Sequence, residues 1–363
     1  MKLPGAPPAA RAPAKVTWAT MAASNPMGQQ RYETEIQAAL AAVADPGRWA
    51  FTRSAFRSMR SPLPGDRRYP VGLLGAAPTW AAGRAGRFLY RGEDLVHRFD
   101  LRLPPTSGAE VVTVHDVAPL RFPDEGPLPG WAGPGARRAR AVICPSAFAA
   151  AEVHELLGVE RTAVIHNGPG AGATDRAPLP AQELASFGLG PCYIVHAGGA
   201  TARKNLAALA GAWRQLAGAH PELFLALCGA PDERRTRLFE GLPRARLLGR
   251  LEPAGLVTRL MAGARAVVVP SVYEGFGFPA LEAMACGTPV VAARAGALPE
   301  VCGGAAELVA PDADSLAEGL ERVFADAPRA ERLRHDGPAR AAGFSWQKAA
   351  RAHLEVYERA LAQ

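Results

Sequence analysis

The sequence predicts an α/β protein with two domains, each built on a parallel sheet. Its 363 residues are long enough to form two hydrophobic cores. In the second half of the chain, short apolar runs typical of buried strands alternate with helix-like patterns, which favours parallel sheets covered by helices on both faces. Between the halves, residues 169–190 are rich in Gly, Ala and Pro, and we expect them to be the interdomain linker.

Composition and charge are those of a globular protein that favours anionic partners. Apolar residues make up 48% of the chain and charged residues 21%. The formal net charge of +7 comes almost entirely from arginine, and it suits an anionic ligand, a nucleic acid or an anionic membrane without choosing among them. The 5 cysteines are scattered and form no C-x-x-C pair, which favours neither a zinc site nor a disulfide framework.

The N-terminal segment predicts neither a signal peptide nor a membrane anchor. Residues 1–14 are rich in Pro and Ala, and we expect them to be disordered. They lack the apolar core of a signal peptide, and no uninterrupted apolar run approaches the ~18 residues of a membrane-spanning helix. We therefore expect a cytoplasmic protein.

The first domain is predicted at residues 15–168. A strand at 16–20 leads into a helical pattern through Tyr32, Ile36 and Leu40. Residues 51–91 follow no clear period and carry eight arginines, which favours a solvated face. Apolar and aromatic residues between these arginines leave open a contact with an anionic acceptor or with the inner membrane surface. Further strand-like runs follow within residues 94–105, 111–123, 139–159 and 161–169.

The second domain is predicted at residues 191–343, and its most informative stretch is residues 267–291. An apolar run passes into a glycine-spaced loop, a short helix bounded by Pro279 and Gly287, and another strand-like run. This is the pattern of a parallel strand–helix–strand crossover. Glu274 lies in the loop and Glu282 in the helix, so both carboxylates can face the crevice beyond the carboxyl end of the strand, where open α/β sheets bind ligands.

The same loop suits an anion. The N–H groups of Gly275, Phe276 and Gly277, together with the positive end of the helix, would accept a phosphate. Carboxylates accept hydrogen bonds from sugar and ribose hydroxyls. A ligand that carries both an anionic diphosphate and sugar hydroxyls is a nucleotide sugar, so these residues together suit such a ligand.

Residues 273–291, YEGFGFPALEAMACGTPVV, resemble the donor-site signature of glycosyltransferase family 4, retaining enzymes of the GT-B fold. The resemblance implies two Rossmann-like domains with parallel sheets facing a central cleft. It also implies that residues 344–363, an apolar-periodic helix, cross back onto the first domain. The activity it implies is transfer of a hexose from a nucleotide-diphosphate sugar to a hydroxyl of a glycan, a lipid-linked or a small-molecule acceptor. Mannosyltransferase-like members give the nearest pattern, so GDP-mannose is the first donor expected and a UDP-hexose the second.

The resemblance also assigns residues. Residues 196–206 resemble the family's G-x-x-x-x-R-K-N pattern, which places Lys204 on the donor phosphates with Arg203 as a helper. Both cations precede a helix, where the dipole disfavours them unless an anion lies between. Glu274 would orient the sugar and Glu282 would hold the ribose. The remaining donor or catalytic positions implied by the resemblance are Gly28, His115, Gly198, Gly249 and Arg250.

Other charged positions are expected to be structural. Asp312 and Asp314 have the D-x-D spacing of metal-dependent transferases, but they precede a helical pattern and suit a helix cap, so no metal or cofactor is expected. Four further histidines are expected at the surface: His154, His220, His335 and His353.

Two other functions stay open at this stage, and a third finds no support. A GT-B phosphorylase would use inorganic phosphate as co-substrate, and a non-catalytic protein would bind a nucleotide sugar without turnover. Nucleic-acid binding is not expected, because no motif of a known module accompanies the basic charge. The sequence does not indicate the oligomeric state.

Overall fold

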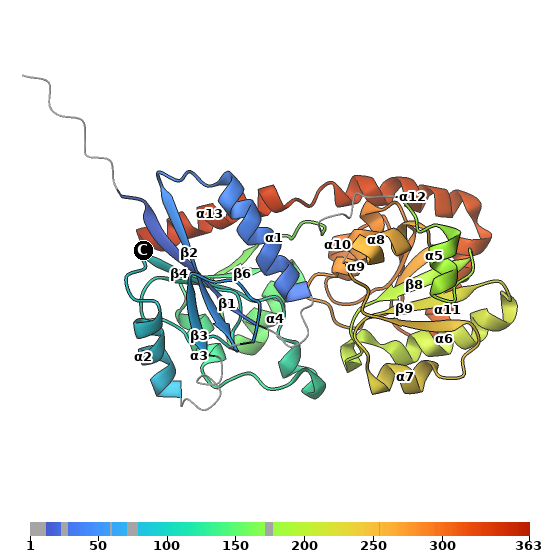
Figure 1. Cartoon of the computed structure of the whole chain (residues 1–363), viewed down its shortest axis with the longest axis horizontal. Coiled ribbons are helices and arrows are strands. Elements are labelled where there is room, and N and C mark those ends of the chain that lie inside the picture. Colours follow the sequence, from blue (N-terminus) through green and yellow to red (C-terminus); the bar gives the residue numbers. More distant parts are fainter. Residues whose placement is uncertain (1–11, 23–27, 59, 71–78, 171–176, 254) are drawn as a thin grey trace, which may run out of the picture.

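The structure is a computed structural model that describes residues 12–22, 28–58, 60–70, 79–170, 177–253 and 255–363. It forms two lobes, each with its own parallel sheet (Figure 1). The two-sheet α/β architecture predicted from the sequence is therefore confirmed.

The first lobe has a seven-stranded sheet in the order β3-β2-β1-β4-β5-β6-β7. Its strands are β1 (Ala14–Met21), β2 (Trp49–Arg57), β3 (Arg67–Pro70), β4 (Leu95–Arg98), β5 (Glu110–Thr113), β6 (Ala141–Cys144) and β7 (Thr162–Val164). Its helices are α1 (Gly28–Val43), α2 (Thr79–Leu89), α3 (Ala132–Arg138) and α4 (Ala147–Leu157), with short 3-10 turns η2 (Ala118–Leu120) and η3 (Pro123–Glu125). Of the segment expected to be disordered, residues 1–11 lie outside the described residues, and β1 already begins at Ala14.

The stretch at residues 51–91 differs from its prediction. It was expected to be irregular, yet it carries most of β2, all of β3 and α2. β2 pairs in parallel with β1 through eight consecutive register pairs, while only part of the strand is buried. Backbone pairing to β1, rather than an alternating apolar pattern, therefore defines this strand, and the sequence pattern could not reveal it.

The second lobe has a six-stranded sheet in the order β10-β9-β8-β11-β12-β13. Its strands are β8 (Tyr193–Ala197), β9 (Phe224–Cys228), β10 (Ala245–Gly249), β11 (Ala266–Val269), β12 (Val290–Ala293) and β13 (Glu307–Val309). Its helices are α5 (Ala181–Ser186), α6 (Leu206–Ala219), α7 (Glu233–Phe239), α8 (Gly255–Ala262), α9 (Phe278–Ala285), α10 (Leu298–Cys302), α11 (Ala313–Ala325) and α12 (Ala327–Ala341), with the 3-10 turn η4 (Ala202–Lys204). In the predicted linker, residues 171–176 lie outside the described residues and α5 forms a short helix.

The crossover predicted at residues 267–291 is β11, α9 and β12. β11 pairs in parallel with β12, and its four residues are all buried, as expected for a strand covered on both faces. Gly277 precedes α9 with φ +101° and Gly287 follows it with φ +77°. Both conformations are strained for other residues, so the two glycines set the ends of this helix.

The last helix, α13 (Trp346–Ala362), packs on the first lobe, against α1, β4 and β5 (Figure 1). The apolar side chains of α1, among them Tyr32, Ile36 and Leu40, share one core with Trp346 and Tyr357 of α13. The C-terminal helix thereby joins the core of the lobe that begins the chain. Among the described residues, no helix combines the length and the apolar character needed to cross a bilayer.

His353 on α13 corrects a prediction, because it is fully buried rather than at the surface. Its Nδ1–H donates to the carbonyl oxygen of Ala349 at 2.7 Å, and its Nε2 lies 2.8 Å from the Tyr32 hydroxyl. Since Nδ1 carries the proton, Nε2 of the neutral ring accepts from Tyr32. Burial lowers the pKa of His353 to about 4, which keeps the ring neutral near pH 7.

The buried hydrogen bonds continue beyond His353. The Tyr32 hydroxyl lies 3.1 Å from Oγ1 of Thr113, and Nε2 of His97 lies 2.8 Å from the same oxygen. Nδ1 of His97 lies 2.6 Å from the Tyr357 hydroxyl. The chain of hydrogen bonds joins α13 to α1, β4 and β5, so these polar groups hold the last helix on the first sheet.

We expect His353→Leu to lower the free energy of unfolding by about 2 kcal/mol at pH 7.5, because the Tyr32 hydroxyl loses its buried acceptor. The folded pKa of about 4 lies below the ordinary histidine pKa of 6.5, so this stabilisation is complete above pH 6.5 and declines as the pH falls toward 4. Urea unfolding at pH 7.5 and pH 4.5 measures the difference between variant and wild type.

The matched control is His335→Leu, whose side chain is 83% exposed. It should change stability little at either pH. A penalty for His353→Leu that is equal at both pH values would contradict a buried neutral ring.

Candidate functional site

A pocket of about 830 Å³ lies between the two lobes. The loops after β4, β5 and β7 line it from the first lobe, and the loops after β8, β9, β10 and β11 line it from the second. Both parallel sheets thus present their carboxyl ends to one crevice, the place where such sheets bind ligands.

The pocket brings together most of the predicted site residues. Those that line it are Gly28, His115, Gly198, Arg203, Lys204, Arg250, Glu274, Gly275, Phe276, Gly277 and Glu282. Gly249 does not line the pocket. Its carbonyl oxygen accepts a hydrogen bond from the Gly229 amide at 2.9 Å, so it supports a neighbouring turn instead.

Residues 273–277, here called the β11 loop, touch the first lobe directly. The Ser146 hydroxyl at the N-terminus of α4 donates to the carbonyl oxygen of Gly275 at 2.6 Å. A Cβ atom on Gly275 would overlap the carbonyl oxygen of His115. The absence of a side chain at Gly275 is therefore what lets the β11 loop and the end of β5 approach each other.

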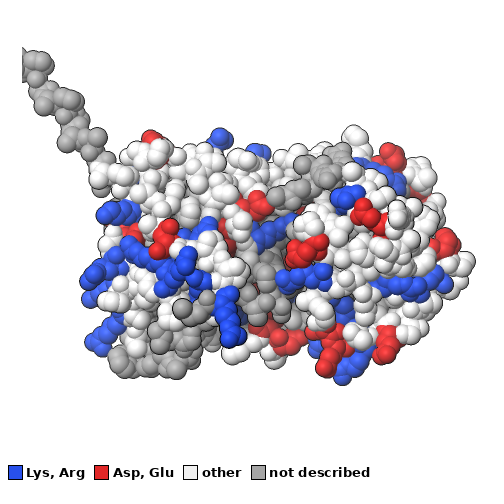
Figure 2. Space-filling model, in the orientation of Figure 1, with Lys and Arg blue, Asp and Glu red and all other residues white. Residues whose placement is uncertain are grey.

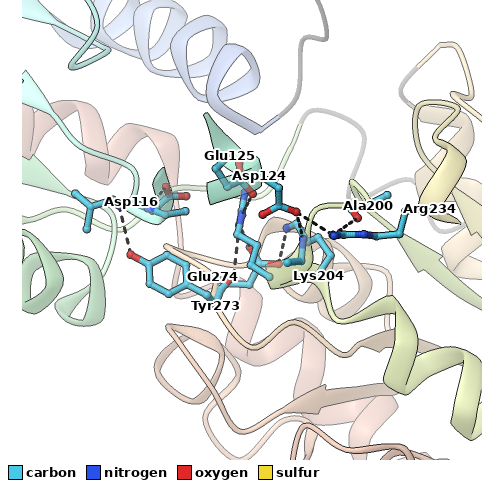
Figure 3. Close-up of polar contacts among 12 residues, drawn as sticks. Asp116, Asp124, Glu125, Ala200, Lys204, Arg234, Tyr273 and Glu274 are labelled. Carbon is cyan, nitrogen blue, oxygen red and sulfur yellow. Dashed lines mark hydrogen bonds and ion pairs between the residues drawn. The ribbon is translucent and has the colours of Figure 1, made fainter. Parts of the chain in front are cut away.

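Glu274 is held by two cations from the turn after β8, and Figure 3 shows one of them, Lys204, beside it. Its Oε1 lies 2.6 Å from Nζ of Lys204, and its Oε2 lies 3.3 Å from Nη1 of Arg203. Burial alone would raise the pKa of this carboxyl, which is 6% exposed, but the two cations outweigh burial and lower it. Glu274 is therefore an ionised carboxylate that faces the pocket.

Asn205 helps to fix this geometry. It follows η4 in the left-handed conformation, with φ 53°, which asparagine tolerates better than most residues. Its side-chain amide donates to the carbonyl oxygen of Pro270 at 3.0 Å. The turn that carries Lys204 is thereby tied to the segment that leads into Glu274.

Two acids of η3 reach across from the first lobe (Figure 3). Glu125 Oε1 lies 2.6 Å from Nε of Arg203. Asp124 Oδ2 accepts from the Ala202 amide at 2.6 Å and from Nη1 of Arg234 at 2.8 Å. The sequence predicted that an anionic ligand would neutralise Arg203. In the structure, carboxylates of the protein itself supply part of that negative charge.

His115 lines the pocket at the end of β5. Burial lowers its pKa to about 4, although Asp116 and Asp100 raise it, so the ring is neutral near pH 7. Its ring packs edge-on against Tyr32, with 4.4 Å between ring centroids. Within the described part of the chain its Nε2 has no hydrogen-bond partner. His115 therefore contributes a neutral ring with one buried, unpaired nitrogen to the pocket wall.

Glu282 forms an ion pair with Arg31 of α1, on the other side of the pocket. Burial raises its pKa, and Arg31 opposes this without cancelling it. Gly28 begins the same helix, and a Cβ atom there would lie 3.3 Å from the Phe278 ring. The start of α1 therefore packs closely on the start of α9, and one oxygen of Glu282 is engaged by the protein itself.

Asn167 lines the pocket but was not singled out from the sequence. It is 1% exposed, and neither its Oδ1 nor its Nδ2 has a partner among the described residues. Buried amides without a partner are rare, and an amide offers both an acceptor and donors to hydroxyl groups. The available signal was its place just beyond β7, at the carboxyl end of a strand.

Asp312 caps a helix, as predicted. Its carboxylate accepts from the Ser315 amide at 2.8 Å at the start of α11. Searched over the described residues, the structure holds no group of three or more His, Cys, Asp and Glu side chains placed to bind a metal ion.

Comparison with known proteins adds a family match. Residues 191–326 match the family described as "Glycosyl transferases group 1". The chain is 51% identical over 110 residues to the MMP alpha-(1->4)-mannosyltransferase of Mycolicibacterium hassiacum, and this match spans 29% of the chain and 26% of that relative. It is 32% identical over 283 residues to the alpha-maltose-1-phosphate synthase of Mycolicibacterium smegmatis, spanning 69% of the chain and 72% of that relative.

Solved structures share the fold. Sucrose-phosphate synthase from Thermosynechococcus elongatus superimposes with a TM-score of 0.73 at 22% identity, over 95% of this chain and 99% of that chain. The Anabaena protein HepE, solved in complex with UDP-glucose, gives a TM-score of 0.72 at 20% identity, over 95% of this chain and 98% of that chain.

We expect Gly275→Ala to lower the free energy of unfolding by about 2 kcal/mol, because the added methyl group overlaps the His115 carbonyl and forces the lobes apart. Urea unfolding measures the loss, and small-angle X-ray scattering should show a larger radius of gyration. Gly218→Ala on α6 is the control, since its Cβ position is open. That change should stabilise the helix slightly. Unchanged stability and radius in Gly275→Ala would refute the contact.

Proposed function

Because the chain belongs to the group 1 glycosyltransferases, a family 4-like group of GT-B proteins, we propose that it transfers a hexose from a nucleotide-diphosphate sugar to a hydroxyl group. The contact of Glu274 with Lys204 at 2.6 Å, inside the pocket between the lobes, carries this proposal. In this contact Lys204 provides a cation for the donor phosphates, and Glu274 provides a hydrogen-bond acceptor for the sugar hydroxyls.

In the proposed reaction, the acceptor oxygen bonds to the anomeric carbon while the bond from that carbon to the phosphate oxygen breaks. Negative charge grows on the leaving diphosphate, and Lys204, Arg203 and the amides of Phe276 and Gly277 would stabilise it. A fixed donor of this kind is often worth about 3 kcal/mol in the transition state. These groups supply positive charge from the protein, which supports a metal-independent transfer.

We propose retention of configuration, with attack on the face from which the diphosphate leaves. The acceptor proton would pass to an oxygen of the leaving phosphate. Glu274, already bound to two cations, is suited to orient sugar hydroxyls rather than to attack carbon. The free nitrogen of His115 and the unpaired amide of Asn167 offer further contacts to the sugar.

GDP-mannose is the donor we favour, and a UDP-hexose is the second candidate. Two relatives support mannose, the Mycolicibacterium hassiacum enzyme and the O-antigen chain mannosyltransferase B of Escherichia coli, which is 40% identical over 100 residues. The UDP-glucose complex of HepE supports the second candidate by fold alone. The acceptor remains a hydroxyl of a glycan, a lipid-linked or a small-molecule compound.

Lys204→Ala and Glu274→Ala should each lower donor-dependent transfer at least about 100-fold, because each removes a charge that contacts donor groups. A donor also stabilises the folded state, so GDP-mannose and UDP-glucose are first compared by the shift of the melting temperature. Lys204→Ala should abolish the shift given by the better donor. Lys348→Ala, an exposed lysine on α13, is the control and should keep it.

Four results would contradict the proposal. One is that neither nucleotide sugar shifts the melting temperature. Another is that the Lys204 and Glu274 variants turn over the donor at the wild-type rate. Turnover that requires inorganic phosphate would instead favour a phosphorylase. Donor binding without any sugar transfer or donor hydrolysis would favour a non-catalytic protein.

We also propose that the first lobe contacts an anionic membrane surface. Figure 2 shows lysine and arginine side chains gathered on this lobe. On α2, Phe88 is 73% exposed, and Arg87 beside it is exposed as well. An exposed aromatic ring among cations is typical of segments that lie on lipid headgroups.

Phe88→Ser should reduce co-sedimentation with vesicles that contain anionic lipid, because the ring no longer enters the headgroup region. The control is Leu247→Ser on the second lobe, because Leu247 is also an exposed apolar residue, at 43%. Equal binding by wild type and Phe88→Ser, or equal loss in both variants, would count against this surface.

A further inference from the structure

Arg235 on α7 is a buried cation beside the pocket. It is 3% exposed. Its Nη1 donates to the carbonyl oxygen of Ala230 at 3.0 Å, and its Nη2 donates to that of Gly198. The helix places it there because Asp232 caps α7 and accepts from the Arg235 amide at 3.1 Å.

The two carbonyl groups belong to neighbouring turns of the pocket wall. β8 and β9 pair in parallel, and Gly198 follows the first strand while Gly229 and Ala230 follow the second. All three residues line the pocket. A Cβ atom on Gly229 would overlap the Gly198 carbonyl oxygen and would lie 2.6 Å from Nη2 of Arg235. Glycine at this position is what allows the guanidinium to hold both turns.

The charge of Arg235 is offset only in part, by the Asp232 carboxylate that caps the same helix. Among the described residues it forms no ion pair, and its Nε has no hydrogen-bond partner. The nearby cations Lys204 and Arg203 are different, because Glu274 and Glu125 neutralise them. Burial lowers the pKa of Arg235, the expected effect on a cation removed from water, and Asp232 opposes this without cancelling it. A buried unpaired charge is costly unless something compensates it.

We propose that Arg235 is a positioning residue for the donor diphosphate, which it serves by tying the two glycine turns together and by supplying positive charge that the diphosphate compensates. The inference rests on the proposed donor site. The guanidinium donates hydrogen bonds to the carbonyl oxygens of Gly198 and Ala230. These oxygens would then repel an anion in the pocket less. The two glycine turns would therefore present less negative potential to the phosphates.

Isothermal titration with GDP and UDP, and with guanosine and uridine, tests the proposal on wild type, Arg235→Met, Arg235→Lys and Arg237→Met. Arg235→Met should lower the affinity for the tighter-binding diphosphate about tenfold or more, equivalent to about 1.4 kcal/mol. The affinity for the matching nucleoside should not change. Arg235→Lys keeps the charge and should retain more of the affinity. Arg237→Met removes a cation from the same helix whose side chain is 75% exposed, and should match wild type.

Two results would overturn the role of Arg235. The first is diphosphate binding by Arg235→Met that equals wild type. The second is an equal loss of affinity for nucleoside and diphosphate, which is the mark of a purely structural role. If Arg235→Met does not fold, the same comparison is made on Arg235→Lys, where an equal loss for both ligands has the same meaning. A wild-type protein that binds neither diphosphate contradicts the proposed function instead.

Discussion

The structure depends on the ionised state of Glu274. A carboxylate buried to this degree would be protonated or would destabilise the fold if it stood alone. Lys204 and Arg203 prevent this, and they can do so because β8 and β11 are neighbours in the sheet. The strand order thus brings the turn after β8 against the β11 loop, and removing one partner would leave a buried charge unpaired.

The same region also joins the lobes. Ser146 binds the β11 loop, Arg31 pairs with Glu282, and Glu125 pairs with Arg203, each across the pocket. These contacts differ in kind, because Gly275 packs on the first lobe through its backbone whereas Glu125 holds Arg203 through a charged hydrogen bond between side chains. An anion arriving at Arg203 competes with Glu125 but not with the backbone contact. Under the proposed function, donor binding would therefore be coupled to the relative position of the lobes.

The parts predicted from the sequence are those set by local rules. Apolar β11, the glycines at the ends of α9 and the spacing of Glu274 and Glu282 are readable along the chain. Residues 51–91 were not, since pairing with β1 defines β2. His353 could have been recognised, because it lies four residues after Ala349 and four before Tyr357, on the buried face of α13.

Arg235 shows where sequence reasoning ends. It lies between Arg234, which binds Asp124 at the surface, and Arg237, which faces solvent, and no residue pattern separates the three. Arg235 is buried because the helix after β9 packs it against Gly198 and Gly229, which the sequence alone does not reveal. The net charge of +7 therefore combines two populations. Exposed arginines are screened by salt, whereas the buried guanidinium of Arg235 is screened far less, so its field acts on the two glycine turns independently of the basic surface.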